Sequence, residues 1–206
     1  MYNVMKPFEE KKFNIPDLKG ISQKTIEEHL KLYSGYVKNA NLIGTKLGEM
    51  WQEDPEKNQY AMAEIARRFS FEYNGMRNHE VYFDSLAGGA KPLSDGPLKA
   101  ALSENYGSFE TFFSIFKTMS MTRGIGWAML WYDRKESRLI NSWVDEQHLG
   151  QLQDCSVILA LDMWEHSYVA DYQPSGKKQY VEDFFVNLNW AKIEERFKIA
   201  DWRNNK

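Results

Sequence analysis

A glycine- and proline-rich stretch, LAGGAKPLSDGP at residues 86–97, separates two parts of this chain that differ in hydrophobic periodicity. Because glycine and proline interrupt regular secondary structure, the stretch is the best boundary between folding units. It predicts an N-terminal domain over residues 1–90 and a C-terminal domain over residues 91–206. With 206 residues, 43% of them hydrophobic, the chain is long enough to bury a sizeable core.

The part before the boundary has a helical pattern. A helix is predicted from about Gln23 through the forties, because Ser22 can cap it and apolar residues recur at helical spacing: Ile26, Leu30, Tyr33, Val37 and Ala40. After a polar break, a second apolar stripe runs from Met62 to Leu86 at the same spacing. Two consecutive helices joined by a short connection predict a helical hairpin.

The part after the boundary mixes helices and strands. Two short helical patterns come first, and three apolar runs then indicate strands, GWAMLWYD (126–133), RLINSWVD (138–145) and CSVILALD (155–162). Helical patterns return at residues 164–172, 177–188 and 190–199. The fold class is therefore predicted as α+β, with an N-terminal helical hairpin domain and a C-terminal α/β domain that holds a small antiparallel sheet.

Composition excludes several classes of protein. A net charge of −3 offers no basic surface for nucleic acid, and no apolar run has the length of a membrane-spanning helix. The first residues, MYNVMKPFEEKKF, lack the apolar core of a signal peptide. Cys155 is the single cysteine, so an intramolecular disulfide is impossible. We expect a cytoplasmic protein with no nucleic-acid or membrane partner.

The sharpest local motif is DMWEHSY at residues 162–168. An apolar strand ends at Asp162, and His166 follows four residues later, so a carboxylate and an imidazole can reach the same cation. The motif alone also fits an aspartate that caps the next helix and a histidine hydrogen-bonded in the core. Both interpretations stay open on these residues alone.

The other histidines strengthen the metal interpretation. The chain has four, and His29 and His79 each lie on or beside the apolar face of a predicted helix. Taken singly, each is more often a core residue than a ligand. Together with Asp162 and His166 they offer three imidazoles and one carboxylate, which suit iron or manganese, although zinc is disfavoured only weakly. Spacing alone does not prove that the four side chains converge.

Five segments, spread over roughly residues 10–200 and in the same order, resemble the iron/manganese superoxide dismutases. They are GISQKTIEEHLKLYSGYVKNANLI, FEYNGMRNHEVYFDSL, GIGWAML, LDMWEHSYVADY and VNLNWAKIEERF. The resemblance implies a superoxide dismutase, an antioxidant oxidoreductase that disproportionates superoxide by redox cycling of one bound Mn or Fe ion per subunit. It also implies that the metal ligands are His29, His79, Asp162 and His166.

The resemblance further implies the surroundings of the ion. Tyr36 corresponds to a tyrosine near the open site, and Trp127 and Trp164 to its aromatic walls, although both tryptophans also fit simple core packing. Gln147 corresponds to the glutamine that bonds the metal-bound solvent, and Gly75 to the small residue opposite it. This Gly75 and Gln147 pattern slightly favours manganese. A slip of one position in the alignment would place His148 there instead.

The chain departs from the family pattern along its first helix. His29 and Tyr36 are seven positions apart where the common pattern has eight, so we expect a regular helix without a π-bulge. The family's pair of gate residues, a tyrosine and a histidine, reads Val169 and, approximately, Tyr33. The family's basic residue is shifted, with Lys177 and Lys178 as candidates.

The assembly is also implied by the resemblance. Glu165 would bond His166 of a second subunit, so a homodimer or a dimer of dimers is expected, with a surface glutamate as the alternative interpretation. Two rival functions remain at this point. A non-catalytic protein could keep the fold, but all four ligands are present. A non-haem iron oxygenase normally uses two histidines and one carboxylate, and the third histidine argues against it.

Overall fold

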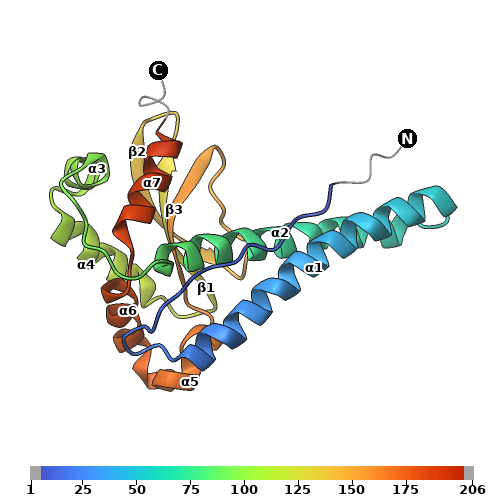
Figure 1. The fold of residues 1–206 in the computed structure, drawn as a ribbon. Coiled ribbons are helices and arrows are strands. Elements are labelled where there is room, and N and C mark those ends of the chain that lie inside the picture. The colour runs from blue at the N-terminus through green and yellow to red at the C-terminus, as the bar shows by residue number, and fades with distance from the viewer. Residues whose placement is uncertain (1–5, 202–206) are drawn as a thin grey trace.

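The structure is a computed structural model that describes residues 6–201. Its N-terminal part is a long antiparallel hairpin of α1 (Gln23–Glu53) and α2 (Gln59–Leu86), which extends well beyond the rest of the molecule (Figure 1). Ser22 caps α1 as predicted, because its hydroxyl oxygen accepts a hydrogen bond from the Thr25 amide at 3.2 Å. The helix is longer than predicted and is regular throughout, which confirms the expected absence of a π-bulge.

Up to residue 201, the C-terminal part holds one small sheet and five α-helices. Helices α3 (Pro97–Tyr106) and α4 (Phe109–Ser120) precede the strands β1 (Gly126–Asp133), β2 (Arg138–Asp145) and β3 (Cys155–Asp162). The strand order is β2-β1-β3, and both pairs are antiparallel. The chain ends with α5 (Val169–Tyr172), α6 (Lys177–Val186) and α7 (Trp190–Ala200). The predicted α+β fold and its strand bounds are confirmed.

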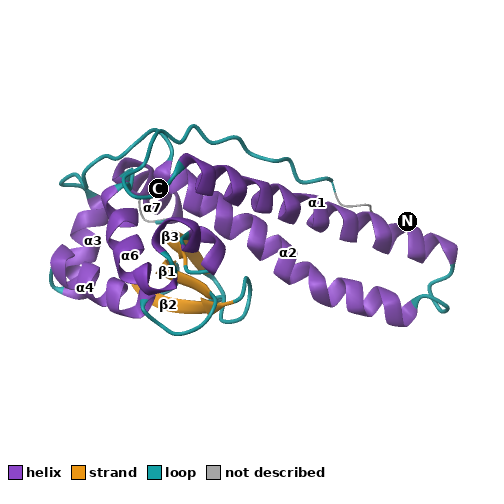
Figure 2. Cartoon of the chain, turned by 90° about the horizontal axis from the view of Figure 1, so that it is seen from below, coloured by secondary structure: helices purple, strands orange, loops and turns teal. Residues whose placement is uncertain are grey.

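The core is centred on β1, whose residues 126–132 are all buried. The sheet packs against α2 through β3 and against α4 and α7 on the C-terminal side (Figure 2). The buried residues of α2 all lie in the half between Glu72 and Leu86, and most of those of α1 lie in its first half. The far ends of both helices expose apolar side chains, including Trp51 and Tyr60. Because α2 lies directly on the sheet, the hairpin and the C-terminal part share one core. The division at residue 90 stays a prediction.

One segment differs from its predicted form. Residues 164–172 are not one helix but a 3₁₀ turn over Glu165–Ser167 followed by the single turn of α5. The Ser167 hydroxyl donates to the backbone carbonyls of Asp162 and Trp164, at 3.0 and 2.7 Å. Such side-chain bonds compete with helical backbone bonding and tighten the turn.

The helices also bear on membrane association. Between residues 6 and 201, none of them combines the length and the apolar character that crossing a lipid bilayer requires.

Candidate metal centre

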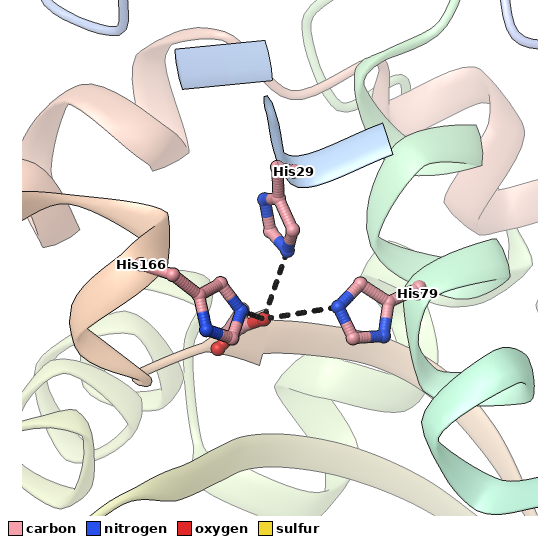
Figure 3. A group of neighbouring side chains, drawn as sticks. His29, His79 and His166 are labelled. Carbon is pink, nitrogen blue, oxygen red and sulfur yellow. Dashed lines mark hydrogen bonds and ion pairs between the residues drawn. The ribbon is translucent and has the colours of Figure 1, made fainter. Parts of the chain in front are cut away.

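Four side chains from four separate segments meet at the base of the hairpin (Figure 3). His29 comes from α1, His79 from α2, Asp162 from the end of β3 and His166 from the 3₁₀ turn that follows. The Nε2 atoms of His29, His166 and His79 lie 3.0, 3.2 and 3.6 Å from Asp162 Oδ2. One ligand atom from each residue lies within 4.8 Å of the other three. The convergence that spacing could not prove is therefore present.

The hydrogen bonding of His79 shows that this group fits a cation. His79 Nδ1 donates to the Gly75 carbonyl at 2.6 Å, so the neutral ring has a bare lone pair on Nε2. That buried atom has no hydrogen-bond partner among residues 6–201 and faces the Asp162 carboxylate. A lone pair facing an anionic oxygen is repulsive, whereas a cation between them makes both contacts favourable. Three nitrogen donors and one oxygen donor suit a first-row transition ion.

Burial sets the protonation of the group. The side chains of His29, His79 and Asp162 are fully buried, and that of His166 is 24% exposed. Burial lowers the pKa of His79 to about 3 and also lowers the pKa of His29, which Asp162 only partly offsets. Although burial opposes it, His166 and His29 hold the pKa of Asp162 below its usual range. Neutral imidazoles and an ionised carboxylate are the forms that bind metal.

The metal-free protein is expected to lose stability as the pH falls from 7 to 5. Unfolded His79 binds a proton below about pH 6.5, whereas the folded residue resists protonation down to about pH 3. Its contribution is therefore fully present above pH 6.5 and is lost as the pH falls through this window. The expected loss at pH 5 is up to about 2 kcal/mol.

Urea unfolding of the metal-free protein at pH 7 and pH 5 measures this loss. The variant His79→Gln is the control, and it should show a smaller difference between the two pH values. Equal free energies of unfolding for the unmodified protein at pH 7 and pH 5 would contradict the buried, neutral state of His79.

A hydrogen-bonded chain lies beside the four residues. Trp127 Nε1 donates to Gln147 Oε1 at 2.9 Å, and Gln147 Nε2 donates to the Tyr36 hydroxyl at 3.0 Å. The rings of Tyr36 and Trp127 each lie 5.0 Å from the His79 ring, measured between centroids. The fully buried Gln147 side chain therefore lies beside the four residues, because it is bonded to both Tyr36 and Trp127. The adjacent His148 packs on Phe71 at 5.6 Å instead.

The backbone around Gln147 explains its direction. Glu146 adopts a left-handed conformation with φ of 50°, and its carbonyl accepts a hydrogen bond from Trp164 Nε1 at 3.1 Å. Asn78 Nδ2 and Gln151 Nε2 donate to the Gln147 carbonyl at 3.0 and 3.1 Å. Sequence reasoning missed Asn78 and Gln151. The position of Asn78 directly before His79 was the one available signal.

Gly75 leaves room for the Tyr36 ring. A Cβ atom at Gly75 would lie 2.5 Å from Tyr36 Cδ1, far inside van der Waals contact. Trp164 is stacked beside His166 with ring centroids 5.8 Å apart, and Glu165 is exposed. Of the residues expected around the ion, Tyr36, Gly75, Trp127 and Trp164 therefore contact the four-residue group. Gln147 is connected to the group through Tyr36 and Trp127.

Two residues considered for the gate and the basic rim, Tyr33 and Lys177, form their hydrogen bonds away from the four-residue group. The Tyr33 hydroxyl is buried under the N-terminal arm, where it accepts from the Lys11 amide at 2.9 Å and donates to Glu80 at 3.3 Å. Lys177 donates to the Thr122 carbonyl at 2.7 Å. Tyr33 thus belongs to the core of the hairpin, since the regular helix turns it inward with His29.

The chain is similar to one known protein family and to several known proteins. Residues 94–196 match the family described as iron/manganese superoxide dismutases, C-terminal domain. A protein of Cupriavidus metallidurans named superoxide dismutase [Fe] is 36% identical over 186 residues, which are 89% of this chain and 91% of the relative. The superoxide dismutase [Fe] of Aquifex aeolicus is 32% identical over 188 residues, 89% of this chain and 87% of the relative.

These matches cover both parts of the fold and include the segments that supply His29, His79, Asp162 and His166. The family model spans half of the chain, and the relatives extend the match to nearly nine tenths of it. The chain therefore belongs to the iron/manganese superoxide dismutases, oxidoreductases that disproportionate superoxide with a bound iron or manganese ion.

Proposed function

We propose that His29, His79, Asp162 and His166 hold the single ion on which superoxide is converted to dioxygen and hydrogen peroxide. When bound, the ion supplies reversible one-electron exchange with superoxide. The observation that supports this ligand set most strongly is the bare His79 Nε2 atom facing the Asp162 carboxylate. Around the ion, the aromatic walls Trp127 and Trp164 would exclude water and so influence its potential.

Tyr36 and Gln147 are proposed to handle protons at the site. Burial raises the pKa of Tyr36 well above its usual value, so its hydroxyl keeps its proton at physiological pH. Gln147 Nε2 donates to the Tyr36 oxygen, and Trp127 Nε1 donates to the side-chain oxygen Oε1 of Gln147. The Tyr36 proton is therefore not used in the bond to Gln147 and can be donated into the site. Disproportionation consumes two protons, and this hydroxyl is positioned to provide one.

Manganese is the proposed ion, by analogy with the family pattern of Gly75 and Gln147, whereas the relatives above carry iron in their names. The test is to remove metal, reload separate samples with iron or manganese, and measure superoxide removal per bound ion. We expect the manganese form to be the more active. Activity confined to the iron form would contradict the choice of manganese, and inactivity of both forms would contradict the ligand set.

A homodimer is the proposed assembly, with a dimer of dimers as its possible extension. The His166 side chain is 24% exposed, whereas those of the other three proposed ligands are fully buried. The neighbouring Glu165 is exposed. A second copy would cover His166 and supply a carboxylate for its other nitrogen, as metal-bound histidines usually require. Light scattering of the unmodified protein and of Glu165→Ala tests this, with a dimer expected for the first and weaker association for the second. A cytoplasmic, antioxidant role completes the proposal.

Substitution of Gly75 by alanine is expected to displace the Tyr36 ring. The new methyl group would lie 2.5 Å from Tyr36 Cδ1, and overpacking of this kind costs about 1–3 kcal/mol. Thermal unfolding should show the loss, and dismutase activity should fall because the bond from Gln147 to Tyr36 is strained.

Gly35→Ala is the matched control for this substitution. Gly35 is also helical, yet no described residue beyond its own helix comes within 4 Å of an added methyl group. The control should be neutral or up to about 1 kcal/mol more stable, since alanine favours helix. A Gly75→Ala protein as stable and as active as the Gly35→Ala protein would contradict the tight packing on Tyr36.

A further inference from the structure

A continuous series of tyrosines leads from the candidate metal centre to the protein surface. The Tyr82 ring lies 4.9 Å from the His29 ring, and the Tyr82 hydroxyl is 3.3 Å from that of Tyr180. The Tyr180 ring lies 5.8 Å from the ring of Tyr172. Tyr82 and Tyr180 are completely buried, whereas Tyr172, on α5, is partly exposed. Helix α5 lies beside the start of α1 (Figure 1), where the Ser22 amide donates to its Asp171.

The hydroxyl hydrogen bonds give this series a direction. The Tyr180 hydroxyl donates to the Asp162 backbone carbonyl at 2.9 Å and to the Tyr82 hydroxyl at 3.3 Å, and neither acceptor is a strong base. The Tyr172 hydroxyl donates to the Asp183 carboxylate at 3.1 Å. Of the three tyrosines, Tyr172 at the outer end is thus the one whose proton can pass directly to a base.

This difference decides where an electron is most easily lost. A phenol that loses an electron becomes a strong acid, so its oxidation is far easier when a base takes the proton at once. Burial raises the pKa of Tyr180 well above its usual value, and burial with the nearby Asp183 does the same for Tyr172. Both are therefore neutral phenols at physiological pH, and Tyr172 is the one with a proton acceptor. An oxidised state that enters the series settles at Tyr172.

We propose that Tyr82, Tyr180 and Tyr172 carry oxidising equivalents away from the metal centre and so protect its ligands. This proposal rests on the ligand set proposed above. The oxidising equivalents come from hydrogen peroxide, which is a product of the enzyme itself. Hydrogen peroxide that accepts one electron from the reduced ion is cleaved at its O–O bond into hydroxide and a hydroxyl radical, which would attack the nearest side chains.

The three tyrosines can supply an electron to this hydroxyl radical from a residue far from the metal centre. An electron passes from Tyr172 through Tyr180 and Tyr82, the hydroxyl radical becomes hydroxide, and the Tyr172 proton moves to Asp183. Superoxide, the substrate, then returns one electron to the Tyr172 radical and leaves as dioxygen, and the proton returns from Asp183. Electrons and protons balance without any further reagent, and the site residues are left unmodified.

Two tryptophans compete with the tyrosines for oxidation. Trp164 is stacked on His166 at 5.8 Å, and Trp127 lies 5.0 Å from His79. The Trp164 N–H donates to a backbone carbonyl and the Trp127 N–H to the amide oxygen of Gln147, and neither acceptor is a base. The carboxylate at Tyr172 is the feature that distinguishes the proposed route.

The test uses the iron-loaded protein, with bound metal measured on each sample. The protein is reduced, mixed with hydrogen peroxide and frozen within milliseconds, and its radicals are identified by electron paramagnetic resonance. We expect a tyrosyl signal that is lost in Tyr172→Phe and kept in Tyr106→Phe, a partly exposed tyrosine of α3 packed on Phe112. Peptide mass spectrometry should find oxidation at Tyr172 in the unmodified protein, and at His29 or Trp127 in the variant.

A second expected effect is on survival in peroxide. Tyr172→Phe should be inactivated several-fold faster than Tyr106→Phe, because damage then stays at the site. An unchanged tyrosyl signal in Tyr172→Phe, or oxidation mainly at Trp164 in the unmodified protein, would overturn the relay while leaving the ligand set intact. Protein that binds no ion at the four residues would overturn the ligand set and the relay together.

Discussion

Replacement of Asp162 by asparagine is expected to reduce superoxide removal by more than about 100-fold. Changes to residues that only hydrogen-bond the metal ligands reach about 100-fold, and a change to a ligand itself should exceed that. The Oδ2 atom of Asp162 lies within 3.6 Å of the Nε2 atoms of all three histidines, so it is the common point of the group. Asparagine keeps the shape but removes the negative charge that the cation needs. The measurement is bound metal by mass spectrometry, together with activity per mole of protein.

Asp154→Asn is the matched control for this change. Asp154 directly precedes the other end of β3, is exposed, and pairs with Lys135 at 3.1 Å. The control should bind metal and remain active. An Asp162→Asn protein with a full complement of metal and unreduced activity would show that this carboxylate is not a ligand.

Replacement of Gln147 by leucine is the second large effect, with an expected loss of activity of about 10–100-fold. Leucine has a similar size but removes the bonds to the Tyr36 hydroxyl and from Trp127 Nε1, at 3.0 and 2.9 Å. The buried Trp127 N–H would then lack an acceptor, and the Tyr36 hydroxyl would lose the donor that fixes it. The reduction potential of the bound metal should shift as well.

Activity and reduction potential of the metal-loaded protein should therefore be compared with those of Gln153→Leu, an exposed neighbour in the same loop. The control is expected to match the unmodified protein in both measurements. If Gln147→Leu also matched it, the assignment of Gln147 to the proton network would be wrong.

The elements of the fold could be predicted where a segment has a strong local pattern. The three strands have the predicted bounds because short apolar runs are flanked by turn residues, and the Ser22 cap is a local interaction. The apolar stripe of α2 predicted burial less well near the start of the helix, which is the end far from the sheet. Ala66 belongs to that stripe and is exposed, because the hairpin extends beyond the sheet and nothing in the local pattern records where the partner layer ends.

The site could be predicted residue by residue, but not as an arrangement. His29, His79 and His166 each carried an inward signal, whereas their meeting at Asp162 depends on how α1, α2 and β3 pack. The choice between Gln147 and His148 was beyond sequence reasoning for a local reason. Glu146 adopts a positive φ that non-glycine residues rarely take, and this turn directs the next side chain inward.

The inward position of Tyr33 follows from the same kind of detail. In a regular helix a residue four positions after His29 lies on nearly the same face, so Tyr33 is buried with it and not placed at the opening. Tyr36 also lies close to this face, because seven positions complete nearly two turns. The family roles expected for Tyr33 and Tyr36 stay predictions.

Anomalous X-ray diffraction from crystals of the metal-loaded protein, recorded at the iron and manganese absorption edges, tests the ligand set most directly. We predict one strong peak per chain, within about 2.0–2.2 Å of the Nε2 atoms of His29, His79 and His166 and of a carboxylate oxygen of Asp162, as first-row ions bind such donors. A peak bound to other side chains, or fully loaded protein with no peak among these four, would contradict the account.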